Sequence, residues 1–319
     1  MRAVAVEAFG QEPAVTEVPV REPGPGEVLV RVQAASVNPL DWQVAAGALA
    51  ERAAHRFPFV LGFDAAGRVE AVGPGAGRFA VGDAVFGQFW SDPLGEGTFA
   101  EYVTAPEQMA AGALMALPAG LDATTAAALP TAAMTALGAV GETGVGAGDT
   151  ILIIGASGGV GSVATRLAAQ RGAHVIATAR PDAAARLRDL GAEETIDYGA
   201  TAVADALAAA HPDGIDAVLD LVGDPATVAA VAAHVRDGGT AISIAFGVSS
   251  ELAADARITA RNYLNQDKPA LLARVAEAAA AGRLGVDVAQ ETTLEGVPAA
   301  LGALRQGGSR GKTVVRVAA

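Results

Sequence analysis

Hydrophobic residues alternate with other side chains in the first part of the chain, which predicts short β-strands. Val28, Val30 and Val32 occupy every second position directly after the turn-forming segment 23–26. Further apolar stretches punctuated by glycine follow at residues 67–72, 83–86 and 98–103. Because these stretches are short and irregularly spaced, we expect a small β-barrel over the first 120 residues.

The pattern changes from about residue 121 to strands that alternate with helices. Residues 151–154 form a continuous apolar run typical of a buried strand, and a glycine-rich turn follows it. An apolar stripe with helical spacing comes next, formed by Val160, Val163, Ala164, Leu167 and Ala168. Further strands are predicted at residues 174–179, 194–198, 217–222 and 240–246. This alternation predicts a doubly wound parallel sheet.

The last part of the chain is too short for a further domain. After Phe246 we expect a polar stretch, a helix over about residues 270–281 and a strand at 313–317. The economical interpretation is that the chain returns to complete its first domain. We therefore expect residues 1–120 and 263–319 to form one domain, with residues 121–262 inserted as a nucleotide-binding domain.

Composition narrows the classes of function. The 319 residues include 51% hydrophobic and 18% charged residues, and their net charge of −13 disfavours nucleic acid and anionic lipid as partners. No apolar segment is long enough for a signal peptide or membrane span, so we expect a cytoplasmic protein with no membrane partner. The chain has no cysteine, which excludes disulfides, a thiol nucleophile and thiolate-bound zinc.

The glycine-rich turn indicates a dinucleotide site. It reads Ala156, Ser157, Gly158, Gly159, Val160 and Gly161, between a predicted strand and a predicted helix. Gly158 would let the backbone approach a pyrophosphate, and Gly161 would let the helix pack closely on the strand. Ala156 stands where the usual fingerprint begins with glycine, so Gly155 is a candidate source of the missing flexibility. The alternative is a turn that only reverses the chain.

The end of the second strand of this domain favours NADPH over NADH. An NAD site normally has an acidic residue there, whereas this chain has Ala179 followed by Arg180. The guanidinium of Arg180 would offer a 2′-phosphate a bidentate partner. The alternative is that Arg180 is a solvated residue at the start of the next helix.

Several segments together resemble the zinc-independent quinone oxidoreductases of the medium-chain dehydrogenase/reductase superfamily. The matching segments are residues 35–42, 61–67, 81–87, 156–161 and 310–312. The resemblance implies an α/β fold with a GroES-like, β-barrel-type catalytic domain and an inserted Rossmann domain. Zinc-dependent members have cysteine, histidine and glutamate ligands where this chain has Asn38, Phe63 and Asp64. Histidine occurs only at positions 55, 174, 211 and 234, and we expect no three-ligand site among them and no metal.

The resemblance also implies which residues contact cofactor and substrate. It places the nicotinamide in a cleft between the domains, near Asn38, Pro130, Thr131 and Thr135, and adds cofactor contacts from Ser243, Phe246, Gly247 and Lys312. The substrate cleft would draw on Asn38, Trp42, Phe89, Trp90, Phe246 and Tyr263. These aromatic residues are equally suited to core packing, and Lys312 to a plain surface position. The polar segment 261–266 departs from the family, in which a mostly apolar strand is expected.

The expected reaction is hydride transfer from NADPH to a quinone or an α,β-unsaturated carbonyl, since conjugated acceptors need no Lewis acid. We expect Asn38 to donate a hydrogen bond to the oxygen of the hydride acceptor. Thr135, Tyr263 or water is the expected source of the proton. No tyrosine is followed four residues later by lysine, which excludes a short-chain dehydrogenase. The remaining alternative is a non-catalytic NADPH-binding sensor or structural protein. The resemblance further suggests a homodimer formed through the edge of the nucleotide-domain sheet.

Overall fold

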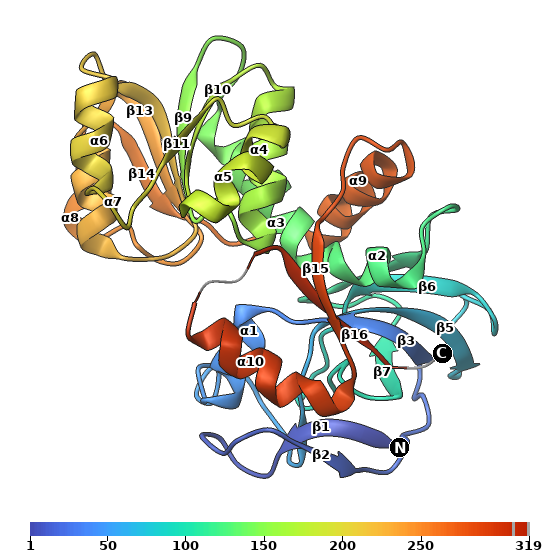
Figure 1. Cartoon of the computed structure of the whole chain (residues 1–319). Coiled ribbons are helices and arrows are strands. Elements are labelled where there is room, and N and C mark those ends of the chain that lie inside the picture. Colours follow the sequence, from blue (N-terminus) through green and yellow to red (C-terminus); the bar gives the residue numbers. More distant parts are fainter. Residues whose placement is uncertain (308–309, 318–319) are drawn as a thin grey trace. The chain divides into compact units, whose positions relative to one another are not determined.

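The computed structural model describes residues 1–307 and 310–317, which divide into two compact units (Figure 1). Unit 1 comprises Met1–Thr131 and Asp267–Ala319, and unit 2 comprises Ala132–Gln266. The limits lie at 131 and 266 rather than at the expected 120 and 262. The later first limit follows from helix α2 (Ala123–Ala128), which packs against strands β3 (Glu27–Ser36) and β5 (Asp64–Val72) of unit 1. None of the helices formed by the described residues is long and apolar enough to cross a membrane.

Unit 1 is built around a mixed sheet whose strands run in the order β15-β16-β3-β5-β6-β8, with β7 also paired to β3. Valine side chains of β3 at every second position lie in its core, as the alternation predicts. A smaller antiparallel sheet, β2-β1-β4, completes the β-structure. The remaining strands are β1 (Arg2–Val6), β2 (Ala14–Glu17), β4 (Phe59–Val60), β6 (Ala84–Gln88), β7 (Tyr102–Pro106), β8 (Ala113–Ala116), β15 (Val288–Thr292) and β16 (Lys312–Arg316).

The return of the chain to unit 1 is confirmed by strand pairing. β16 pairs antiparallel with β3 and parallel with β15, so the two ends of the chain share one sheet. The helices of this unit are α1 (Pro39–Ala45), α2, α9 (Lys268–Ala280) and α10 (Val297–Arg305), with a 3-10 turn at Leu294–Gly296. The strand expected at residues 98–103 begins later, at Tyr102, because Thr98 and Phe99 bond instead to Gly62 and Leu61.

Unit 2 is a doubly wound parallel sheet with strand order β11-β10-β9-β12-β13-β14, the order of a dinucleotide-binding fold. Figure 1 shows α4 and α5 on one face and α6, α7 and α8 on the other. The strands are β9 (Thr150–Ile154), β10 (His174–Thr178), β11 (Glu194–Ile196), β12 (Ile215–Asp220), β13 (Val235–Ser243) and β14 (Thr259–Asn262). The helices are α3 (Pro130–Thr143), α4 (Gly159–Gln170), α5 (Pro181–Asp189), α6 (Val203–Ala210), α7 (Pro225–Ala232) and α8 (Ser250–Ala253).

The first two residues of the polar segment 261–266, Arg261 and Asn262, belong to β14. This strand lies at the edge of the sheet, pairs with β13 on one side, and leaves all its residues except Ala260 exposed. An edge strand needs no apolar side chains on its open faces. The side chain of Asn262 is used locally instead, since its Oδ1 accepts from the Val248 N–H and its Nδ2 donates to the Val248 carbonyl.

Candidate functional site

Unit 1 contains a buried polar cluster where β3, β5 and β16 meet. Antiparallel pairing places Ser36, the last residue of β3, beside Asp64, the first residue of β5, and near the start of β16. Asn38 follows β3 and precedes helix α1, so its side chain enters the same region. Its Nδ2 donates to the Ser36 carbonyl at 3.2 Å and to Asp64 Oδ2 at 3.0 Å. The amide of Asn38 is therefore held within the protein.

The carboxylate of Asp64 holds the first turn of α3. Thr131 donates its backbone N–H to Asp64 Oδ2 at 3.1 Å and its hydroxyl to Asp64 Oδ1 at 2.7 Å. Gln88, which pairs with Asp64 across β5 and β6, donates to the Thr131 hydroxyl at 2.6 Å. A negative group at a helix N-terminus is stabilised by the unpaired amides there. Asp64 thus performs the capping role and is itself fully buried.

Lys312 supplies the positive charge of this cluster. Its ammonium donates to Asn38 Oδ1 at 2.6 Å and to the Val37 carbonyl at 2.8 Å, and the residue is 4% exposed. Burial lowers the pKa of Lys312, while the charges of Asp64 and Asp41 act in the opposite direction. The described geometry does not support the expected cofactor contact of Lys312, because its ammonium points into the protein and bonds to Asn38.

The two buried carboxyl groups of the cluster have raised pKa values. Burial raises the pKa of Asp64, although the charge of Lys312 and the hydrogen bonds from Thr131 and Asn38 oppose this. Burial and the nearby charge of Asp64 raise the pKa of Asp41 to about 8, against the hydrogen bond from the Asn38 N–H and the charge of Lys312. Asp41 Oδ1 is buried without a hydrogen-bond partner, as a neutral carboxyl tolerates better than a charged one.

Asn38, Pro130 and Thr131, three of the residues expected near the nicotinamide, lie in or beside this cluster. Asn38 is 4% exposed, and its Nδ2 and Oδ1 have partners in Ser36, Asp64 and Lys312. It therefore offers no uncommitted donor to a substrate oxygen in this structure. Pro130 is buried at the start of α3, and the Thr131 hydroxyl and N–H are both bonded to Asp64. In this structure the side-chain donors of Asn38 and Thr131 are therefore bonded within the cluster.

The glycine turn of unit 2 lies between β9 and α4, as the sequence predicts. Gly155 has φ +83°, which is unfavourable for other residues, and its N–H donates to the Thr178 hydroxyl at 3.0 Å. A Cβ at Gly161 would lie 2.3 Å from the Gly155 carbonyl oxygen, so this glycine permits close packing of α4. A Cβ at Gly158 would meet only the Gly155 oxygen, at 3.6 Å. Gly158 therefore faces space that another molecule can occupy.

This geometry fits the pyrophosphate of a nicotinamide dinucleotide. Gly158 is the cap residue of α4, and the first amides of that helix have no intrahelical acceptor. Ser157, Gly159 and Val160 are partly exposed, whereas Ala156 and Gly161 are buried. Gly155, with its left-handed backbone, performs the turning role that the usual first glycine has. The residues present can thus hold a dinucleotide with the backbone of the turn and the N-terminus of α4.

Two arginines of α5 and its cap lie near the ends of β9 and β10. Arg180 is exposed, caps α5, and lies with its guanidinium 5.5 Å from the ring centre of Tyr198. Arg186 donates from Nη2 to the Ser157 carbonyl at 2.6 Å, which places a second guanidinium at the glycine turn. Sequence reasoning missed Arg186 because it lies 29 residues beyond Ser157, and only the packing of α5 brings them together.

The loop after β13 contains the other expected cofactor residues of unit 2. Ser243 is buried and donates its hydroxyl to Asp220 Oδ2 at 2.5 Å while accepting from the Gly247 N–H at 2.9 Å. Gly247 is buried as well, and a Cβ there would lie 2.7 Å from Asp220 Oδ2. These residues shape the loop and do not present free groups. Phe246, in contrast, has φ +62° and is 58% exposed.

The two expected proton donors both lie against helix α3. Thr135 accepts a hydrogen bond from Asn265 Nδ2 at 3.2 Å. The Tyr263 hydroxyl packs so closely on the helix that a Cβ at Gly138 would lie 1.9 Å from it. Gly138 therefore makes room for the Tyr263 ring. Both residues are partly exposed, and the structure brings them to one helix of unit 2.

The three aromatic residues of unit 1 that are expected at the substrate site do not line one common cavity. Phe89 is 1% exposed and belongs to the core of unit 1, which corrects its assignment as a cleft residue. Trp90 lines a cavity of about 690 Å³, with Lys268 Nζ 5.0 Å from its ring centre. Trp42 lines a different cavity of about 190 Å³ beside α10. Trp90 is thus the one of the three beside a cavity large enough for a quinone ring.

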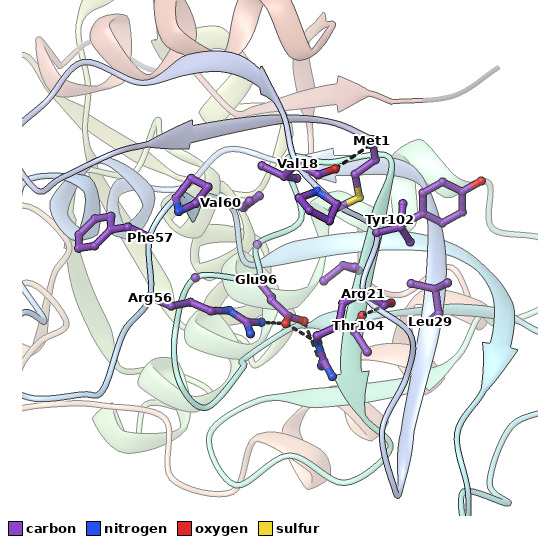
Figure 2. A pocket seen from close by; sticks show the side chains of 16 residues that line it. Met1, Val18, Arg21, Leu29, Arg56, Phe57, Val60, Glu96, Tyr102 and Thr104 are labelled. Atoms are coloured by element: carbon purple, nitrogen blue, oxygen red, sulfur yellow. Dashed lines mark hydrogen bonds and ion pairs between the residues drawn. The ribbon is translucent and has the colours of Figure 1, made fainter.

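A further cavity of unit 1, of about 190 Å³, contains none of the expected site residues (Figure 2). Met1, Val18 and Val60 line part of it, and Arg21, Arg56 and Glu96 lie at another part. Both guanidinium groups form ion pairs with Glu96. The charges are therefore satisfied within the wall, and this cavity is a poorer candidate for an anionic ligand than the glycine turn.

Three side chains suited to metal binding meet elsewhere in unit 2. One ligand atom from each of His174, Glu194 and His211 lies within 4.8 Å of the other two. The sequence predicts no three-ligand site among the histidines, and the structure nevertheless brings two of them and a carboxylate together. No metal-binding spacing is visible in the sequence, because Glu194 is 20 positions from His174 and 17 from His211. The three residues meet only through the packing of β10, β11 and α6.

Comparison with known proteins shows the family. Residues 24–118 match the alcohol dehydrogenase GroES-like domain, and residues 190–315 match the zinc-binding dehydrogenase domain. The chain is similar to a quinone oxidoreductase from Coxiella burnetii, with a TM-score of 0.89, 30% identity, and coverage of 100% of this chain and 99% of that one. A quinone oxidoreductase from Pseudomonas syringae superposes with a TM-score of 0.86 at 29% identity, with 99% of each chain covered.

Curated relatives extend this similarity. A chloroplast envelope quinone oxidoreductase homolog from Arabidopsis thaliana is 36% identical over 207 residues, which are 62% of this chain and 61% of the relative. The spinach chloroplastic homolog is 38% identical over 57% of this chain and 55% of the relative. The matched segments thus span somewhat over half the length of these relatives. The full-length structural matches, the two domain matches and the strand order agree, and the chain belongs to the medium-chain dehydrogenase/reductase superfamily, beside its quinone oxidoreductases.

Proposed function

We propose that this chain is an NADPH-dependent oxidoreductase that transfers hydride to a quinone or an α,β-unsaturated carbonyl. The observation that carries the proposal is the glycine turn, in which Gly161 is required for packing and Gly158 faces open space. The relatives named quinone oxidoreductases support the acceptor class. When bound, the reduced nicotinamide supplies the hydride. The chain's own residues must then bind the dinucleotide, hold the acceptor and deliver a proton.

Preference for NADPH rests on charge at the end of β10. Ala179 is buried and neutral where an NAD site would have a carboxylate, and the exposed Arg180 follows it. The Arg180 guanidinium lies 5.5 Å from the ring centre of Tyr198 and is exposed, and a guanidinium can bind a phosphate through two parallel hydrogen bonds. Arg186 adds a positive charge beside the Ser157 carbonyl. This arrangement favours a cofactor with an additional phosphate.

Independence from zinc rests on the partners within the polar cluster. Asn38 and Asp64 stand where zinc ligands occur in related dehydrogenases, and they bond to each other. Asp64 also accepts from Thr131, and the Lys312 ammonium donates to Asn38. The ammonium takes the position of a counter-ion to Asp64, and a divalent cation beside it would be repelled. Conjugated acceptors suit such a site because their resonance spreads the developing charge.

We assign Asn38 to positioning and keep Thr135, Tyr263 and water as proton sources. Asn38 links Lys312 to Asp64, and Asp64 in turn fixes the first turn of α3. Thr135 lies one turn further along α3, and Tyr263 packs on the same helix at Gly138. Asn38→Ala should therefore lower kcat through a displaced α3 and should leave the binding of NADPH by the glycine turn nearly intact.

The reaction is tested by following NADPH oxidation with a panel of quinones and enones, with simple secondary alcohols and NADP as the comparison. NADPH deuterated at C4 should label an enone product at its β-carbon. Deuterium found only in the solvent, or faster turnover of alcohols than of every quinone and enone, contradicts the proposal. Tight NADPH binding without turnover of any acceptor would instead support a sensor or structural protein.

A further inference from the structure

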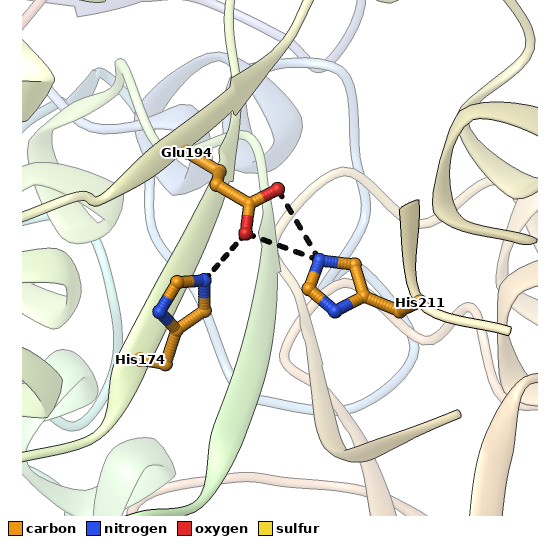
Figure 3. Close-up of side chains that lie close together, drawn as sticks. All are labelled: His174, Glu194 and His211. Carbon is orange, nitrogen blue, oxygen red and sulfur yellow. Dashed lines mark hydrogen bonds and ion pairs between the residues drawn. The ribbon is translucent and has the colours of Figure 1, made fainter. Parts of the chain in front are cut away.

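The carboxylate of Glu194 lies between two imidazole rings at one end of the sheet of unit 2 (Figure 3). Glu194 Oε1 is 2.6 Å from His174 Nε2, and His211 Nε2 is 3.2 Å from the same carboxylate. The ring centres of the two histidines are 5.9 Å apart. All three side chains are partly exposed, so an ion from solvent can reach them.

The elements that carry these residues fix their positions. His174 is the first residue of β10 and Glu194 the first residue of β11, so their side chains emerge at the amino ends of adjacent parallel strands. His211 ends helix α6, where its N–H donates to the Leu207 carbonyl at 2.8 Å. The C-terminal end of a helix carries partial negative charge and favours a cation. Three separate elements therefore converge on one point.

A second carboxylate orients His174 for metal binding. Glu193 Oε2 lies 2.9 Å from His174 Nδ1, which leaves Nε2 directed at Glu194. Metal-binding histidines commonly donate from their other ring nitrogen to such a carboxylate, which fixes the ring and strengthens the ligand. The cluster thus has three ligand groups and a supporting carboxylate, whereas a simple surface ion pair would consist of only two groups.

We propose that His174, Glu194 and His211 bind one divalent transition-metal ion, for which Zn²⁺ is the best chemical match. Imidazole nitrogen and carboxylate oxygen are its usual ligands at about 2.0–2.2 Å, and three protein ligands leave one position for water. The ligand atoms already lie within 4.8 Å of one another, so small side-chain rotations suffice to surround an ion.

This site is distinct from the glycine turn. His174 begins β10, and Thr178, which holds the turn through Gly155, ends it. The four residue-to-residue steps from His174 to Thr178 span about 13 Å of strand. The ion would join β10, the edge strand β11 and helix α6, so its effect is to stabilise the edge of the sheet. The inference does not depend on the proposed reaction.

The test measures Zn²⁺ binding by the full chain, purified without a polyhistidine tag and stripped with a chelator. Calorimetry should show one Zn²⁺ bound per chain, and Co²⁺ should give visible absorption typical of nitrogen and oxygen ligands. The Tm should rise with Zn²⁺ concentration, since a ligand that binds only the folded state stabilises it. His174→Ala and His211→Ala should abolish all three signals.

Two further variants make the test graded. Glu193→Gln removes only the orienting carboxylate and should weaken Zn²⁺ binding about tenfold to a hundredfold. His234→Ala changes a histidine of the same unit outside the cluster and should leave binding unchanged. The proposal is overturned if the wild-type chain binds no Zn²⁺, or if His174→Ala and His211→Ala bind it as tightly as the wild type. Circular dichroism of each variant confirms that a lost signal does not come from unfolding.

Discussion

The polar cluster of unit 1 and the glycine turn of unit 2 satisfy their hydrogen-bonding groups in different ways. In the cluster, the side chains of Asn38, Asp64 and Lys312 bond to one another and are almost fully buried. At the turn, the groups available for binding belong to the backbone, and Gly158 leaves the space in front of them open. A change in the cluster should therefore affect stability first, whereas a change at the open part of the turn should affect ligand binding first.

Lys312→Met should have the largest effect and would test the cluster most directly. It leaves the carboxyl group of Asp64 without its buried counter-charge, which typically costs about 3–5 kcal/mol. Urea unfolding should show this loss, while folded Lys312→Met should still bind NADPH normally. Lys268→Met is the control, because that ammonium donates to one carbonyl, of Ala111 at 2.6 Å, and its loss should cost only about 1 kcal/mol. If Lys312→Met is as stable as the wild type but binds NADPH weakly, Lys312 contacts the cofactor instead.

The paired variants Gly158→Val and Gly161→Val separate binding from packing within one turn. Gly158→Val should weaken NADPH binding about tenfold to a hundredfold, the value of a hydrogen bond to a charged group. Gly158 has φ −77°, a backbone conformation that any residue can adopt, so the free energy of unfolding should change by no more than about 1 kcal/mol. Gly161→Val should lose about 1–3 kcal/mol of stability through overpacking. Fluorescence titration and urea unfolding measure the two effects, and equal loss of stability in both variants would contradict the distinction.

Arg180→Glu should change cofactor preference with little effect on stability, because Arg180 is exposed. The KM for NADPH should rise about tenfold to a hundredfold as a charged hydrogen bond is replaced by repulsion, while the KM for NADH should change little. Arg188→Glu is the matched control, since Arg188 lies on the same helix but donates to the Thr195 hydroxyl. If both cofactors respond equally to Arg180→Glu, the arginine is a surface residue and Arg186 becomes the candidate phosphate ligand.

Near pH 4, Asp41→Asn should have the smallest of these effects on stability, and its effect should grow as the pH rises. Folding raises the pKa of Asp41 from 3.8 to about 8, so within this window the folded chain holds more protons than the unfolded one. The free energy of unfolding therefore falls as pH rises from 3.8 to about 8. Asp41→Asn removes this pH dependence. The free energy of unfolding of the variant should therefore rise, relative to that of the wild type, by up to about 1.4 kcal/mol for each unit of pH increase. Urea unfolding between these pH values measures the gain, with Asp213→Asn at an exposed position as the control. A difference that does not vary with pH would show that Asp41 is ionised in the folded chain.

The order of elements and the glycine turn could be predicted from the sequence because both depend on neighbouring residues. The apolar run of β9, the turn after it and the stripe of α4 are contiguous, and each segment reports its own conformation. The return of β16 to the first domain was predictable because the residues after Phe246 are too few to bury a core of their own. The edge strand β14 was harder to predict, since its polar residues lack the pattern of a buried strand.

The candidate site depended far more on tertiary structure. The sequence alone determined which residue types were available, including the absence of cysteine and of an acid at Ala179. Only the fold decided that Lys312 turns inward to Asn38, 274 residues away, and that Arg186 reaches Ser157. In the same way His174, Glu194 and His211 meet because two strands and a helix end at one place. The physical reason is that backbone conformation is set by local sterics and hydrogen bonding, whereas the partner of a side chain is set by the packing of elements distant in sequence.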